Sequence, residues 1–88
     1  MMSKYKVLFK SSAANELKKI DKHNLKKILN KIELLSQNPI PSGVKKLKGE
    51  PYFRIRIGHY RVIYEINYTN NEVIIYRIRH RKDAYKGL

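Results

Sequence analysis

Residues Tyr52–Ile66 read YFRIRIGHYRVIYEI, with apolar and polar side chains alternating on both sides of Gly58-His59. Alternation with a period of two is typical of a strand, and a two-residue turn with glycine first favours a β-hairpin. This stretch therefore predicts two antiparallel strands joined at the glycine. The predicted cross-strand pairs are Ile57 with Tyr60, Arg56 with Arg61, and Arg54 with Ile63.

The predicted register separates the hairpin into two faces. One face is apolar and is expected to form the core: Phe53, Ile55, Ile57, Tyr60, Val62, Tyr64 and Ile66. The other, open face carries Arg54, Arg56, Arg61, Ile63 and Glu65. Arg56 and Arg61 lie directly opposite each other, and like charges in that position weaken a sheet. A polyanionic ligand explains this arrangement better than folding does.

Periodicity and turn residues place further elements around the hairpin: a strand at 4–9, helices at about 12–21 and 24–36, a loop at 38–43, a short strand at 44–48 and a strand at 72–79. Ser11 or Ser12 can cap the first helix. The order β-α-α-β-β-β-β predicts an α+β fold, in which a small, mostly antiparallel twisted sheet of four to five strands carries an N-terminal helical hairpin on one face.

The last predicted strand, EVIIYRIR, is assigned faces by simple alternation. One face then holds Ile74, Tyr76 and Ile78, and the other holds Val73, Ile75, Arg77 and Arg79. Continuing the same alternation places Arg81 with the arginines.

The composition describes a single domain, residues 1–88, with a strong positive charge. Lys and Arg number 20 against 7 Asp and Glu, which gives a formal net charge of +13. Such a charge favours nucleic acid, an anionic membrane or an acidic protein as partner. A membrane is the least favoured, because no apolar run approaches the roughly 20 residues that span a bilayer.

The N-terminus and the absence of cysteine bear on the compartment. Lys4, Lys6 and Lys10 interrupt any apolar signal segment, so we expect no export and a cytoplasmic location. Without cysteine the chain forms no disulfides or thiolate metal sites. The three histidines are isolated in the sequence, so we expect neither a metal-dependent mechanism nor a cofactor.

Several cationic side chains are candidates for binding and catalysis. The expected catalytic group is Arg54, Arg56, Arg61, Arg81 and Tyr85. The planar guanidinium of arginine can donate two parallel hydrogen bonds to phosphate oxygens. A tyrosine can stack on a base or transfer a proton. The alternative is a solvated charged face whose arginine stems cover the sheet.

A second group is expected to hold a nucleic-acid backbone: Lys45, Lys46, Lys48, Arg77, Arg79 and Lys82. For the three lysines, a solvated loop is an equal alternative. His80, next to Arg81, is a candidate for proton transfer near neutral pH. His23 and His59 are interpreted as structural or exposed.

The chain resembles the RelE/ParE superfamily of toxin-antitoxin toxins, and its RelE branch in particular. The resemblance rests on LLSQNP at the end of the second helix, on KKLKGEPYFRIRIGHYRVIYEI and on IRHRKDAY. It implies a ribosome-dependent, metal-free endoribonuclease that cuts mRNA in the decoding site. In that reaction the ribose 2′-hydroxyl attacks the adjacent phosphate and leaves a 2′,3′-cyclic phosphate.

The resemblance also assigns roles by motif. Arg61 in HYR matches the family's hairpin arginine, and Arg81 and Tyr85 in HRKDAY match its C-terminal arginine and tyrosine. Arg54 and Arg56 stand where relatives carry lysines. Because a guanidinium is effectively never deprotonated, these two can bind and stabilise but do not transfer protons. Tyr85 or His80 is left for that step.

The same resemblance implies partners: a cognate antitoxin with an acidic wrapping segment, mRNA and the ribosome, and operator DNA only through the antitoxin complex. Two alternatives stay open. The ParE branch shares the fold but inhibits DNA gyrase without nuclease chemistry. A third reading is a catalytically weak RNA-binding homologue, since both family lysines are replaced by arginine.

Overall fold

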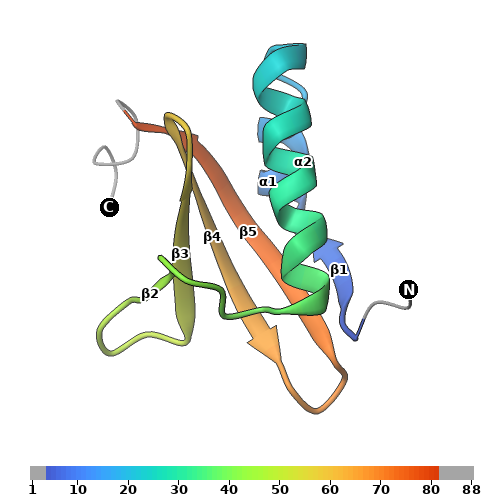
Figure 1. Ribbon diagram of the computed structural model, residues 1–88, viewed down its shortest axis with the longest axis vertical. Coiled ribbons are helices and arrows are strands. Elements are labelled where there is room, and N and C mark those ends of the chain that lie inside the picture. Colours follow the sequence, from blue (N-terminus) through green and yellow to red (C-terminus); the bar gives the residue numbers. More distant parts are fainter. Residues whose placement is uncertain (1–3, 82–88) are drawn as a thin grey trace.

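The computed structural model describes residues 4–81 of the chain. Within this range the elements are β1 Lys6–Phe9, α1 Ser11–Leu17, α2 Lys22–Gln37, β2 Lys45–Lys46, β3 Tyr52–Ile57, β4 Tyr60–Asn67 and β5 Glu72–His80 (Figure 1). The strand order in the sheet is β1-β5-β4-β3-β2. β1 runs parallel to β5, and the other neighbours are antiparallel. The predicted α+β fold and mostly antiparallel sheet are confirmed.

The β3–β4 hairpin has the predicted register. Ile57 pairs with Tyr60 and Arg56 with Arg61 across the two strands. Gly58 begins the turn with φ of 60°, in the left-handed region that glycine adopts without a steric cost. The turn residues and the alternation within the hairpin are therefore enough to specify this pairing.

The alternation predicted for β5 is wrong, because the strand contains an extra residue. Tyr64 pairs with Ile75 but Ile63 pairs with Arg77, so Tyr76 has no partner of its own in β4. Such a bulge shifts the faces by one residue. Val73, Ile75 and Ile78 are all buried in the core as a result, while Arg77 and Arg79 pair with residues of the open face.

The core lies between the helices and the apolar face of the sheet. The buried residues that form it are Ala13, Ile28, Ile32, Leu35, Ile55, Ile57, Val62, Tyr64, Ile66, Val73, Ile75 and Ile78. Phe53 and Tyr60 pack against this cluster, as the hairpin pattern predicts. Burial of each large aliphatic side chain contributes about 1.5–3 kcal/mol.

Both ends of helix α2 are set by residues that the sequence makes recognisable, a capping aspartate at the start and an Asn-Pro pair at the end. The Asp21 carboxylate accepts hydrogen bonds from the backbone N–H and the side-chain amide of Asn24, and these bonds lower the pKa of Asp21. Asn38 ends the helix just before Pro39. The Tyr64 hydroxyl donates to the Pro39 carbonyl at 2.6 Å, which ties the chain after α2 to the sheet.

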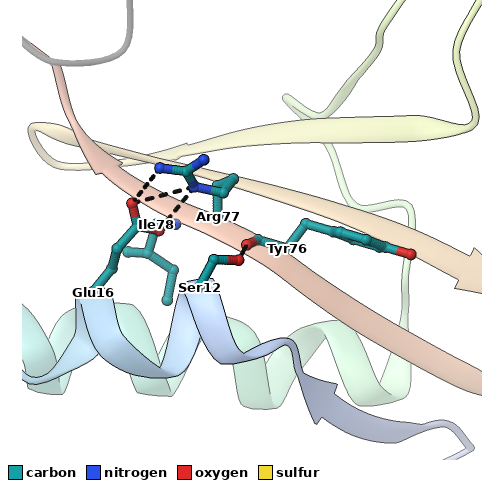
Figure 2. A network of polar contacts seen from close by, with 5 residues as sticks. All are labelled: Ser12, Glu16, Tyr76, Arg77 and Ile78. Atoms are coloured by element: carbon teal, nitrogen blue, oxygen red, sulfur yellow. Dashed lines mark hydrogen bonds and ion pairs between the residues drawn. The ribbon is translucent and has the colours of Figure 1, made fainter. Parts of the chain in front are cut away.

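The helix α1 covers the part of the β5 edge that β1 leaves unpaired. Neither Ser11, which is the first helical residue, nor Ser12 caps the helix. The Ser12 hydroxyl donates instead to the Tyr76 carbonyl at 2.7 Å. The Glu16 carboxylate accepts from the Ile78 backbone N–H at 2.7 Å (Figure 2). Side chains of α1 thus take the hydrogen bonds that a further strand would have taken.

Five elements have bounds that differ from the sequence prediction. β1 begins at Lys6 rather than at residue 4, and β5 ends at His80 rather than at residue 79. The first helix is shorter, Ser11–Leu17, and the short second strand is reduced to Lys45–Lys46. α2 begins two residues earlier than predicted, directly after its cap Asp21. No helix among residues 4–81 is long and apolar enough to cross a membrane.

Removing the Glu16 side chain tests how much the covered edge contributes to stability. Glu16→Ala leaves the Ile78 N–H without its acceptor and is expected to lower the free energy of unfolding by about 2 kcal/mol. The Arg77 ion pair adds little, because that side chain is 41% exposed. Urea titration is the measurement. Glu33→Ala, an exposed α2 control, should change stability by less than about 0.5 kcal/mol. Equal losses in both variants would contradict the role of the edge.

Candidate nucleic-acid interface

A basic hollow opens on the sheet face that the helices leave uncovered. It measures about 260 Å³ and is lined by Gly43, Lys45, Arg54, Arg56 and Arg61. Four of these residues are cationic, and no carboxylate of the described part of the chain lines the hollow. A hollow of this size and charge fits a phosphate group with part of its ribose.

Strand pairing brings the arginines of three strands into one row across the open face. Arg56 of β3 lies opposite Arg61 of β4, which in turn lies opposite Arg79 of β5. We call these three residues the arginine row. Because neighbouring strands are about 4.8 Å apart, the three side chains start close together on a rigid base. The row extends the basic hollow towards β5.

Arg61, at the centre of the row, is only 7% exposed. A buried arginine keeps its charge, and it has interaction partners within the chain. Its burial and its partners restrict the movement of its side chain. A guanidinium held in this way is suited to binding an anion at a defined position.

Lys45 and Arg54 form the other wall of the hollow. They lie directly opposite each other in the β2–β3 pair. Gly43, in the loop before β2, contributes a surface without a side chain. Gly43 was not predicted as part of the site, although its place after two prolines and two residues before Lys45 is a detectable signal.

The remaining predicted RNA-binding residues are distributed differently. Lys46 is the neighbour of Lys45 in a strand and so alternates to the other side, and Lys48 lies in the following turn. Both are exposed, and neither lines the basic hollow. Their contact with RNA stays a prediction.

Arg77 already has a partner inside the protein. Its Nη2 atom lies 2.9 Å from Oε2 of Glu16, and its Nε atom also donates to that carboxylate (Figure 2). The ion pair commits Arg77 to the α1–β5 contact. Sequence reasoning missed Glu16, because its partner is 61 residues away.

His80 lies on the other face of the sheet from the arginine row. It pairs with Tyr60, which packs against the core, and its ring contacts those of Tyr60 and His59 at centroid distances of 5.1 and 6.1 Å. This register does not support proton transfer by His80 at the basic hollow. The role stays a prediction.

The C-terminal candidates are described in part. Arg81 is exposed, and its backbone N–H donates to the His59 carbonyl at 2.6 Å, so it lies beside the hairpin turn. Lys82 and Tyr85 fall outside the described residues. Among residues 4–81, no three His, Cys, Asp or Glu side chains lie together as a metal site.

Comparison with known proteins shows the family. The family described as "ParE toxin of type II toxin-antitoxin system, parDE" matches residues 7–85. The chain therefore belongs to the ParE toxin family of type II toxin-antitoxin systems.

Individual relatives carry RelE names. Toxin RelE3 of Methanocaldococcus jannaschii is 38% identical over 85 residues, which cover 91% of this chain and 94% of the relative. The archaeal RelE-RelB complex from Pyrococcus horikoshii matches with a TM-score of 0.80 and 28% identity, over 92% of this chain and 99% of that one. The RelB-RelE complex from Methanococcus jannaschii matches with a TM-score of 0.76 and 31% identity, over 92% and 98%. The chain is thus a RelE-like toxin, as the resemblance predicted.

The opposed pair of arginines gives a stability prediction. Arg56→Gln removes one of two like charges that face each other and is expected to stabilise the free protein by about 0.5 kcal/mol at low salt. The gain should shrink as salt screens the repulsion. Lys27→Gln, which removes an exposed charge of α2, is the matched control. Urea titrations that show no difference between the two variants would mean that the pair carries no strain.

Proposed function

We propose that this toxin is a ribosome-dependent endoribonuclease that cuts mRNA in the decoding site without a metal. The observation that carries the proposal is the basic hollow, where Lys45, Arg54, Arg56 and Arg61 converge on a volume that fits one phosphate group. The similarity to RelE toxins supports the same assignment. The reaction is attack of a ribose 2′-hydroxyl on the adjacent phosphate, giving a 2′,3′-cyclic phosphate and a 5′-hydroxyl end.

In this proposal the arginines stabilise charge that grows on the phosphate oxygens as the new bond forms. Arg61, fixed by burial, holds the phosphate, and the exposed Arg56 closes on it from β3. Groups that are already oriented cost no reorganisation at the moment of reaction. The deprotonation of the 2′-hydroxyl is assigned to Tyr85 acting as a phenolate, because guanidinium groups keep their protons and His80 pairs on the other face. The leaving 5′-oxygen takes up a proton from water.

We further propose that a cognate antitoxin with an acidic, extended segment holds the toxin inactive. The net charge of +13 favours such a partner, since acidic groups relieve the self-repulsion of the chain. RelE relatives are seen in complex with RelB antitoxins. The ribosome and mRNA are the proposed targets of the released toxin, and operator DNA is contacted only through the antitoxin complex.

A second candidate function is inhibition of DNA gyrase by binding. The observation that favours it is the family match itself, which carries the ParE name. A third is RNA binding with little cleavage, because arginine occupies positions 54 and 56. These candidates predict different products and are separable in one set of assays.

Adding the purified toxin to a translation reaction should create new 5′-hydroxyl ends on ribosome-bound mRNA. Arg56→Gln is expected to slow single-turnover cleavage by about 100-fold, because it removes one stabilising charge at the phosphate. Lys27→Gln should cleave like the wild type, since the charge it removes lies on α2. Intact mRNA together with inhibited supercoiling would favour gyrase binding instead. Intact mRNA with retained RNA binding would favour the weak homologue.

Replacing Tyr85 tests the proton-transfer step. Tyr85→Phe removes the phenolic hydroxyl and is expected to lower the cleavage rate by at least about 100-fold while leaving mRNA binding unchanged. The measurement is the single-turnover rate on programmed ribosomes across a range of pH. A variant that cleaves as fast as the wild type would remove Tyr85 from the mechanism.

Salt titration tests the charge contribution to antitoxin binding. Raising the ionic strength from about 0.1 M to about 1 M shortens the screening length from about 10 Å to about 3 Å. We expect the association rate with the antitoxin to fall steeply over this range, because charge steers the encounter. An association rate that does not change would mean that apolar packing governs the complex.

A further inference from the structure

Beside the basic hollow, the open face of the sheet carries a small aromatic and acidic cluster that the proposed chemistry does not use. Tyr52 of β3 lies directly opposite Glu65 of β4. Tyr76, the extra residue in β5, donates its hydroxyl to Oε1 of Glu65 at 3.1 Å. We call these three residues the tyrosine shelf. All three side chains are partly exposed.

Ring–ring and cation–π contacts hold the side chains of the tyrosine shelf in place. The Tyr52 and Tyr76 rings pack edge to face with centroids 5.0 Å apart and planes at 70°. The ammonium of Lys10 lies 5.5 Å from the centre of the Tyr76 ring. Figure 2 shows the Tyr76 ring extending along the strand, away from the Arg77 guanidinium. The bulge therefore sends two neighbouring side chains in different directions, one to Glu16 and one to the shelf.

Glu65 has acceptor capacity left over. In the described part of the chain Oε1 accepts the Tyr76 hydroxyl, and no hydrogen bond reaches Oε2. Burial and the hydrogen bond to Glu65 raise the pKa of Tyr76, which keeps its hydroxyl a donor at neutral pH. Because Tyr76 fixes the carboxylate, Oε2 is presented in one orientation.

The shelf lies one nucleotide step from the hollow. Tyr52 is two residues before Arg54 on the same face, a distance of about 6.6 Å along the strand. A phosphate at Arg54 and Arg56 would leave an adjacent base of the same strand within reach of Tyr52. The positive hollow and the partly exposed ring are the two parts of a single-stranded nucleic-acid site: a charge for the backbone and a face for the base.

We propose that the tyrosine shelf reads the base next to the phosphate held in the basic hollow. The base stacks on the Tyr52 ring, and Glu65 accepts hydrogen bonds from its edge. A carboxylate accepts but does not donate, so it selects a base with adjacent N–H groups, of which guanine is the best example. The inference rests on the proposed function, because it assumes an RNA strand in the hollow.

Equilibrium binding of short oligoribonucleotides tests the shelf without depending on cleavage. The probes are fluorescent RNA hexamers, labelled at one end, that contain only uridine or uridine with one guanosine. Wild-type toxin is expected to prefer the guanosine probe by about tenfold. Glu65→Gln keeps an acceptor for Tyr76 but replaces Oε2 by a donor, and should abolish that preference. Glu33→Gln on α2 is the matched control.

A second variant separates stacking from hydrogen bonding. Tyr52→Ala should weaken the binding of both probes by about tenfold, because stacking does not depend on the base. Tyr68→Ala, which removes an exposed tyrosine of the turn after β4, should leave binding unchanged. Equal preference in wild type and Glu65→Gln, or unchanged binding by Tyr52→Ala, would overturn the shelf. Absent cleavage with a preference that Glu65→Gln abolishes would overturn the proposed nuclease and keep the shelf.

Discussion

The pairing of β5 with β4 is the constraint on which the other features depend. A register shift at Tyr76 lets Val73, Ile75 and Ile78 all reach the core, although no regular alternation allows it. The same shift turns Arg79 towards Arg61. One extra residue thus completes the core and the arginine row together.

The part of the β5 edge that β1 leaves unpaired explains how α1 is attached. Beyond Phe9, β1 no longer pairs with β5. The Tyr76 carbonyl and the Ile78 N–H on this edge of β5 therefore have no strand partner. Ser12 and Glu16 satisfy these groups through side chains rather than through another strand. A carboxylate that accepts both a backbone N–H and a guanidinium holds the C-terminal half of β5 in place, and with it the arginines beyond.

The positive charge on the open face destabilises the folded protein and favours the binding of an anion. Arg56, Arg61 and Arg79 lie side by side in a chain with an excess of 13 positive charges, and among residues 4–81 no carboxylate lines the basic hollow. Such a surface is tolerated because the core supplies the stability, and it becomes favourable when an anion arrives. The proposed partners, RNA and an acidic antitoxin segment, are both anionic. The tyrosine shelf adds the proposed contact with a base on this face.

The sequence by itself determined the hairpin register, the fold class, the capped second helix and the positions of Arg54, Arg56 and Arg61, because these follow from short-range alternation and turn chemistry. The tertiary structure decided the faces of β5, the ion pair of Arg77 and the separation of His80 from the arginines. Three consecutive apolar residues, Val73 to Ile75, give alternation no parity to follow. Glu16 and Arg77 meet across 61 residues of sequence. Contacts of that kind arise only when the whole sheet and its helices are packed.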